Sequence, residues 1–350
     1  MLRVIDLRSD TATRPTPAMR AAIAAAEVGD EQRGEDPTVR ALERLAAEFL
    51  GQAAAVYVPT ATMANQIALR ILTQPGDELL AEENAHVLIN EQGAPAALSG
   101  LVMRGLPGRD GRFSPEQVRE AIRDWRSGHM PVTRLVCVED THNSSGGRVW
   151  PLDELQALTE TASELDLRLH LDGARLVNAA VAQGVAPAEI GRRFDTVTLC
   201  LSKGLGCPLG ALVAGSEDLM VKARRAKHLF GGAMRQAGIV AAAGLHALDH
   251  HVDRIADDHA RARRLAEGLA AAGLPIDLEQ VETNFVHVDV APLGLTRTEA
   301  RQRLDAAGVG LSSTVHPRVL RAVTHLDVSD EDVDRAIELI PRALGALVRA

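Results

Sequence analysis

The stretch LHLDGAR, residues 169–175, is typical of a buried strand that ends in a carboxylate, Asp172, and turns at once. Ligands of open α/β sheets lie beyond the carboxyl ends of the strands, so Asp172 stands where a ligand would bind. An aspartate in this place can equally cap the helix that follows. The stretch therefore predicts an α/β fold and leaves two roles open for Asp172.

A second junction lies in TVTLCLSKGLG, residues 196–206, where an apolar strand ends near Lys203. Most lysines are exposed surface charges. A lysine in an apolar turn flanked by glycine is instead partly desolvated, and desolvation favours the neutral, nucleophilic amine that a Schiff base requires.

A third junction, VYVPTATMAN at residues 56–65, joins a strand to the start of a helix through small and polar residues. Unpaired N–H groups at a helix start, together with the helix dipole, can hold a phosphate without a cation. Most junctions of this kind bind nothing, so this signal is weak by itself.

The three junctions gain meaning from their order along the chain. A phosphate turn, then an aspartate at a strand end, then a lysine at a strand end are what pyridoxal 5′-phosphate needs. The helix start holds the phosphate, Asp172 keeps the pyridine nitrogen protonated, and Lys203 carries the aldehyde carbon as a Schiff base. The combination predicts this cofactor.

In the rest of the chain, on both sides of these junctions, short aliphatic runs alternate with amphipathic stretches. This alternation favours a mixed, mostly parallel sheet flanked by helices. We predict a large cofactor-binding domain, residues 1–248, whose segment 1–24 contributes to the site, and a small α+β domain, residues 249–350. Predicted strands are 53–58, 78–81, 99–104, 134–138, 168–171, 196–201, 210–214, 285–289, 309–313 and 319–325. Predicted helices are 17–27, 37–51, one that starts near 63–65, 89–97, 114–126, 151–165, 217–228, one or two within 235–273, 296–307 and 329–348.

Composition narrows the possible partners. The 350 residues carry a net charge of −9 with no basic block, and only 2% are aromatic, which argues against nucleic acid. Three cysteines give no disulfide framework and no metal-ligand spacing, so we expect free thiols and no metal. Without a signal sequence or an 18-residue apolar run, we expect a cytoplasmic protein that binds no membrane.

The sequence resembles the low-specificity L-threonine aldolase family of fold-type-I pyridoxal-phosphate enzymes. The similarity runs in order along almost the whole chain, and several of its motifs are too long for chance. The matching stretches are DLRSDTAT (6–13), GEDPT (34–38), TMANQ (62–66), AHV (85–87), THN (141–143), HLDGAR (170–175), SKGL (202–205), MRQ (234–236) and VTHLDVS (323–329).

This resemblance implies a carbon–carbon lyase that cleaves L-threonine, L-allo-threonine and related β-hydroxy-α-amino acids into glycine and an aldehyde. It implies a homodimer or homotetramer with sites between subunits. The implied cofactor ligands are Lys203, Asp172, His86 above the ring, the phosphate-binding Ala61, Thr62 and Met63, and Arg175 and Arg235. The implied ligands of the substrate carboxylate are Ser9, Arg175 and Arg321.

A base must take the proton of the β-hydroxyl group, and an imidazole has a suitable pKa. His86 and His142 are the candidates, and a water that relays to either of them is equally consistent. Two positions depart from the family pattern. Arg33 replaces a tyrosine near the substrate side chain, and Ala61 replaces a glycine, which requires a negative φ at that position.

Three other functions are compatible with parts of the pattern. Aminotransferases, β-eliminating lyases and racemases of the same fold share the roles of Asp172 and Lys203. A non-catalytic cofactor-binding module is disfavoured because Lys203 is present and no basic domain precedes residue 6. A pure assembly protein would bind no cofactor at Lys203.

Overall fold

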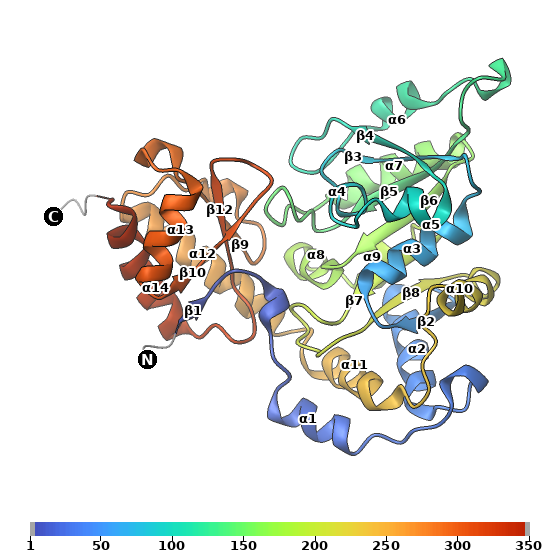
Figure 1. Cartoon of the computed structure of the whole chain (residues 1–350), viewed down its shortest axis with the longest axis horizontal. Helices are drawn as coiled ribbons and strands as arrows, with labels where there is room; N and C mark the ends of the chain where they lie inside the picture. Colours follow the sequence, from blue (N-terminus) through green and yellow to red (C-terminus); the bar gives the residue numbers. More distant parts are fainter. Residues whose placement is uncertain (1–3, 347–350) are drawn as a thin grey trace.

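The fold is built around one seven-stranded sheet in a computed structural model that describes residues 4–346 (Figure 1). Its strand order is β2-β8-β7-β6-β5-β3-β4, and only β8 runs antiparallel to its neighbours. The carboxyl ends of the six parallel strands thus share one edge. The strands are β2 (Ala54–Val58), β3 (Glu78–Glu82), β4 (Val102–Leu106), β5 (Thr133–Glu139), β6 (Arg168–Gly173), β7 (Thr196–Cys200) and β8 (Ala211–Gly215).

Helices cover both faces of this sheet, and successive strand residues alternate between the two cores. On β2, Ala55 and Tyr57 face one cluster whereas Val56 and Val58 face the other. One face holds α3 (Ala61–Leu72), α5 (Ala94–Ser99) and α10 (Glu217–Leu229). The other face holds α2 (Pro37–Leu50), α6 (Pro115–Ala121), α7 (Leu152–Glu164), α8 (Leu176–Gln183), α9 (Pro187–Gly191) and α11 (Gly238–His250), with α1 (Pro17–Ala24) against α11.

A second core lies in the C-terminal part of the chain. It is formed by α12 (Ile255–Ala271), α13 (Arg297–Ala306) and α14 (Asp330–Leu344) against an antiparallel sheet ordered β11-β12-β9. These strands are β9 (Phe285–Asp289), β11 (Ser312–Ser313) and β12 (Val319–Val323). The N-terminal strand β1 (Ile5–Asp6) joins this part by pairing with β10 (Val309–Gly310). We propose a domain boundary near residue 249, with β1 returning to the C-terminal domain.

Most predicted elements are confirmed, and the differences have local causes. Asp36 caps α2 by accepting the N–H of Val39, and Tyr57 is fully buried in the core. All three cysteines are buried free thiols. The stretch 235–273 forms two helices, α11 and α12.

Several predicted boundaries were wrong. The helices predicted at 17–27 and 329–348 end earlier, at Ala24 and Leu344. The predicted helix 89–97 is interrupted, because Gln92 and Gly93 adopt positive φ between α4 (His86–Ile89) and α5. The predicted helix 114–126 ends at Ala121, the predicted strand 99–104 lies at 102–106, and 309–313 divides into β10 and β11. The last two residues of the predicted helix 329–348 lie outside the described residues. Within residues 4–346 no helix combines the length and apolarity needed to cross a membrane.

Candidate active site

A cavity of about 500 Å³ opens where the two cores meet, at the carboxyl ends of the parallel strands. Its lining comes from segments far apart in the sequence. Lys203 follows β7, Arg175 follows β6, and Arg321 reaches in from β12. The other lining residues are Ser9, Thr11, His86, Asn90, Asn143, Ser144, Ser313, Thr314 and Val315. The cavity is therefore polar, with Val315 as its one aliphatic side chain.

Asp172 lies at the end of β6 and is 1% exposed. One of its oxygens accepts the N–H of Ala174 at 3.1 Å, which satisfies the turn that follows the strand. The other oxygen accepts the amide Nδ2 of Asn65, on α3, at 2.8 Å. Asp172 does not cap α8, whose N-cap residue is Arg175, so the capping alternative was wrong.

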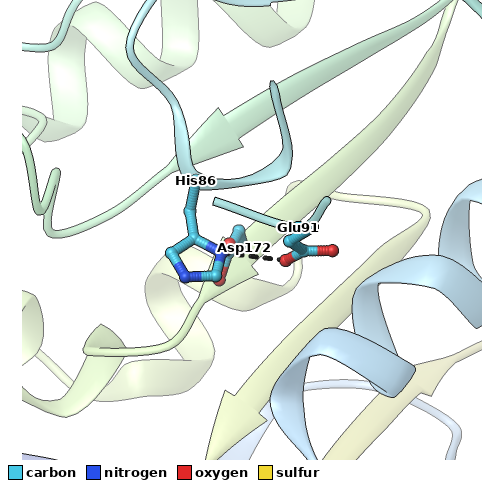
Figure 2. Close-up of side chains that lie close together, drawn as sticks. All are labelled: His86, Glu91 and Asp172. Carbon is cyan, nitrogen blue, oxygen red and sulfur yellow. Dashed lines mark hydrogen bonds and ion pairs between the residues drawn. The ribbon is translucent and has the colours of Figure 1, made fainter. Parts of the chain in front are cut away.

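His86 is the first residue of α4 and one wall of the cavity. Its backbone N–H donates to Glu139 at 2.6 Å, which fixes where the helix begins. Its ring Nδ1 lies 2.9 Å from Oε1 of Glu91, a carboxylate with no exposed surface. Figure 2 shows His86, Glu91 and Asp172 together beside the strand ends. These three could hold a metal by their spacing, but their facing atoms already bond one another or Asn65. The absence of a metal stays a prediction.

Lys203 reaches the cavity from the Gly-rich turn after β7, and a hydrogen bond holds its backbone in place. The hydroxyl of Thr13 donates to the carbonyl of Lys203 at 2.9 Å, so the N-terminal segment fixes this turn. Gly204 and Leu205, which follow it, are buried. Within residues 4–346 the amine Nζ has no hydrogen-bond or ion-pair partner, which leaves it available to a ligand.

Two guanidinium groups share one wall of the cavity but differ in their partners. Arg175 makes two bonds of 2.7 Å to the carboxylate of Asp10, which is fully buried, and both guanidiniums donate to Oδ1 of Asn143. Both also lie over the ring of Phe285, with Cζ of Arg175 at 4.9 Å and Cζ of Arg321 at 5.2 Å from the ring centroid. Arg321 has no carboxylate partner among residues 4–346, and burial beside Arg175 lowers its pKa to about 10. Arg321 is thus the guanidinium still open to an anion.

The phosphate turn forms the start of α3. Thr60 is its N-cap, and the hydroxyl of Thr60 already accepts the N–H of Met63 at 3.1 Å. Within the described chain the N–H groups of Ala61 and Thr62 have no partner. Ala61 is helical, with none of the positive φ that would exclude its Cβ. Asn65, one turn along the helix, bonds Asp172, so this helix start lies against the carboxylate.

Seven predicted site residues do not line the cavity of their own chain. Four of them are Asp172, at the end of β6, and Ala61, Thr62 and Met63, at the start of α3. The other three are His142, Arg33 and Arg235. The ring of His142 is fully buried, 3.1 Å from Glu82, with Glu139 also nearby, and these carboxylates raise its pKa against the effect of burial. Arg33 and Arg235 are largely exposed, and each pairs with Asp30.

Sequence reasoning missed Glu91, Asp10 and Asn143 as site residues, although the latter two stand in recognised motifs. Asp10 meets Arg175 across 165 residues. Glu91 reaches His86 because the helix breaks between them, at Asn90. No periodic signal in the sequence marks such contacts.

The donor set fits pyridoxal 5′-phosphate. It offers a free amine, a buried carboxylate on the neighbouring strand, an imidazole beside them, and a helix start with two unpartnered N–H groups. This sheet and these strand ends have the fold of the fold-type-I pyridoxal-phosphate enzymes.

Comparison with known proteins agrees with this fold class and identifies the family. Residues 6–292 match the model of the beta-eliminating lyase family. The chain is 39% identical over 338 residues to a probable low-specificity L-threonine aldolase 2 of Arabidopsis thaliana, covering 95% of each. It is 40% identical over 334 residues to the low specificity L-threonine aldolase of Escherichia coli K12, covering 94% of this chain and 96% of the other. The fold superposes on a threonine aldolase of Leishmania major with a TM-score of 0.83, at 21% identity and covering 97% and 99%. The chain belongs to the low-specificity L-threonine aldolase family and is a lyase.

Proposed function

We propose that this chain cleaves the Cα–Cβ bond of L-threonine, L-allo-threonine and related β-hydroxy-α-amino acids, with pyridoxal 5′-phosphate bound covalently to Lys203. The products are glycine and an aldehyde. The names of the relatives support this reaction. The observation that supports it most is that one cavity joins a lysine amine, an imidazole and a guanidinium that, among residues 4–346, has no carboxylate partner. An amino-acid substrate supplies the anion that Arg321 lacks.

Arg321 binds the substrate carboxylate in this proposal. Ser9 lines the same cavity and can donate a second hydrogen bond to that carboxylate. Arg175 is saturated on its Nε and Nη2 by Asp10, so it holds the wall and positions Asn143. A carboxylate held in two-point contact fixes the orientation of the amino acid, which decides which bond at Cα is broken.

The proton of the β-hydroxyl group needs an acceptor on the cavity wall. His86 lines the cavity, and its Nδ1 is occupied by Glu91, so Nε2 is the nitrogen left for substrate or for a relaying water. His142 is less suited because its ring is enclosed between Glu82 and Glu139. When bound, the cofactor supplies an electron sink for the bond that breaks.

The test is incubation of the purified protein with L-threonine and L-allo-threonine in the presence of the cofactor. Acetaldehyde and glycine should appear in equal amounts. Because the matching family model is that of β-eliminating lyases, 2-oxobutanoate and ammonia are the products to monitor for the rival activity. Their release in place of glycine from threonine would overturn the aldolase proposal.

Replacing Arg321 by glutamine should raise the KM for L-threonine by about 10- to 100-fold while changing kcat less, because a charged hydrogen-bond partner of the bound substrate is lost. Steady-state kinetics measure both constants. Arg318→Gln, on the same segment but exposed, is the matched control and should leave KM unchanged. A loss in kcat with no change in KM would contradict the assignment.

The remaining assignments are also proposals. Arg33 and Arg235 lie on one face around Asp30, and α10 and α11 expose the apolar Leu229 and Ile239. This face supports a homodimer or homotetramer in which Arg33 and Arg235 serve a neighbouring site, and sedimentation of an active monomer would refute it. Free buried cysteines accord with a cytoplasmic address.

A further inference from the structure

Glu91 is a buried carboxylate that touches the candidate base His86 and has so far been given no role of its own. Two amide N–H donors and one imidazole nitrogen surround it in the structure. Oε1 accepts Nδ2 of Asn65 at 2.8 Å and faces Nδ1 of His86 at 2.9 Å, and Oε2 accepts Nε2 of Gln66 at 2.6 Å. A carboxylate anion can accept from both amides and from a protonated Nδ1 at the same time. The surroundings of Glu91 are therefore built for an anion.

This arrangement decides which nitrogen of His86 carries a proton. A carboxylate oxygen can only accept, so Nδ1 must be the donor in the contact with Oε1. Nε2 is then left for the cavity that His86 lines, and Figure 2 shows this nitrogen on the side of the ring away from Glu91. Free imidazoles in water prefer the opposite neutral form, so the Nδ1–H form has to be imposed by a partner.

Asn65 connects Glu91 to Asp172 by hydrogen bonds. Its Nδ2 donates to Glu91 and to Asp172, at 2.8 Å each, which uses both amide hydrogens. Its Oδ1 lies 3.2 Å from Nε2 of His170, so His170 must donate there. Burial lowers the pKa of His170 to about 4, so this ring is neutral, and its Nδ1 can accept from the hydroxyl of Thr196. One orientation of each group satisfies the whole chain of bonds.

We propose that Glu91 is a positioning residue, which holds His86 in its Nδ1–H form with Nε2 toward the substrate and, through Asn65, aligns Asp172 with the same site. The inference deepens the proposed function, since it concerns how the candidate base is oriented. Its tests on His86 itself need no turnover, so they can fail or succeed independently of the aldolase reaction.

The charge on His86 follows from the groups that face it. Burial lowers its pKa, Glu91, Asp172 and Glu139 raise it, and Lys203 lowers it, with a net rise above the usual value. His86 is thus a cation below this raised pKa and can accept a proton only above it. Activity that depends on neutral His86 should rise with pH through this pKa.

The first test is a pH titration of the wild-type protein labelled with ¹⁵N-histidine, with and without the cofactor, in which His86→Asn identifies the signals. At high pH the nitrogen shifts should report the Nδ1–H form of His86. The Nε2–H form would overturn the proposal, and this measurement needs no change at Glu91.

The second test is Glu91→Gln. It should lower the pKa of His86 by about one to two units, since a charged hydrogen-bond partner is lost. The acidic limb of kcat/KM should move to lower pH by the same amount, with the KM for L-threonine little changed because Arg321 is untouched. The variant should fold, because Oε1 of Gln66 has no partner and a flipped Gln66 can accept from the new amide.

Gln66→Leu is the matched control, because it removes a donor from Glu91 and leaves the contact with His86 in place. The pKa of His86 should stay raised in this variant. If Glu91→Gln leaves the titration of His86 where it is in the wild type, Glu91 is a purely structural carboxylate and the inference is wrong.

Discussion

Changing Lys203 to alanine is expected to lower kcat/KM for L-threonine by at least about 10³-fold, because no other amine can take its place in the cavity. The sequence contains only three lysines. Lys222 is exposed on α10, and Lys227 is buried in an ion pair of 2.6 Å with Glu31. Neither lines the cavity, so Lys203 alone can carry the cofactor.

The attachment can be measured apart from activity. Borohydride treatment of the wild-type protein followed by digestion should place a pyridoxyl group on the peptide that contains Lys203. The Lys203→Ala protein should show no such peptide, and Lys222→Ala should behave as the wild type. A modified Lys222 or Lys227, or full activity of Lys203→Ala, would contradict the proposed site.

Asp172→Asn is expected to lower kcat/KM by about 10²- to 10³-fold, because in the role that the sequence predicts Asp172 supplies the negative charge that keeps the ring nitrogen of the cofactor protonated. Covalent attachment at Lys203 should survive, so the reduced peptide remains while turnover falls. The new amide also cannot accept from both Ala174 and Asn65, which bind the two oxygens of Asp172.

The control for Asp172 is Asp218→Asn, an exposed position in the first turn of α10, which should stay within about threefold of the wild type. The rates are measured with saturating cofactor so that weaker binding is not mistaken for slower chemistry. Activity of Asp172→Asn within that threefold range would show that the carboxylate does not serve the ring nitrogen.

The sequence could predict those parts of the fold and site that depend on local order. Asp172 and Lys203 follow apolar runs, and runs of that length form neighbouring parallel strands, so their side chains meet at one sheet edge. Pairs such as Asp10 with Arg175 could not be predicted, because they depend on how distant segments pack. The break between α4 and α5 was missed because Gln92 adopts a positive φ that its residue type does not announce.

The two candidate bases, both histidines, also show that packing between distant segments could not be predicted from the sequence. His86 and His142 both stand in family motifs, and the sequence favours His86 only by resemblance and by the loop-like residues that follow His142. Packing separates them: one ring lines the cavity, and the other is enclosed by two carboxylates.

The pairing of β1 with β10 has a consequence for how the protein is made. The first strand finds its partner only at residues 309–310, so β1 cannot pair until most of the chain has left the ribosome. The residues that follow β1 bond Arg175 and the Lys203 turn, which are also made long after them. The large sheet can form earlier, but its reactive edge is completed last. A newly made chain can thus form the large sheet before it completes the site. A bulky tag at the N-terminus would interfere with the second step, the pairing of β1 with β10.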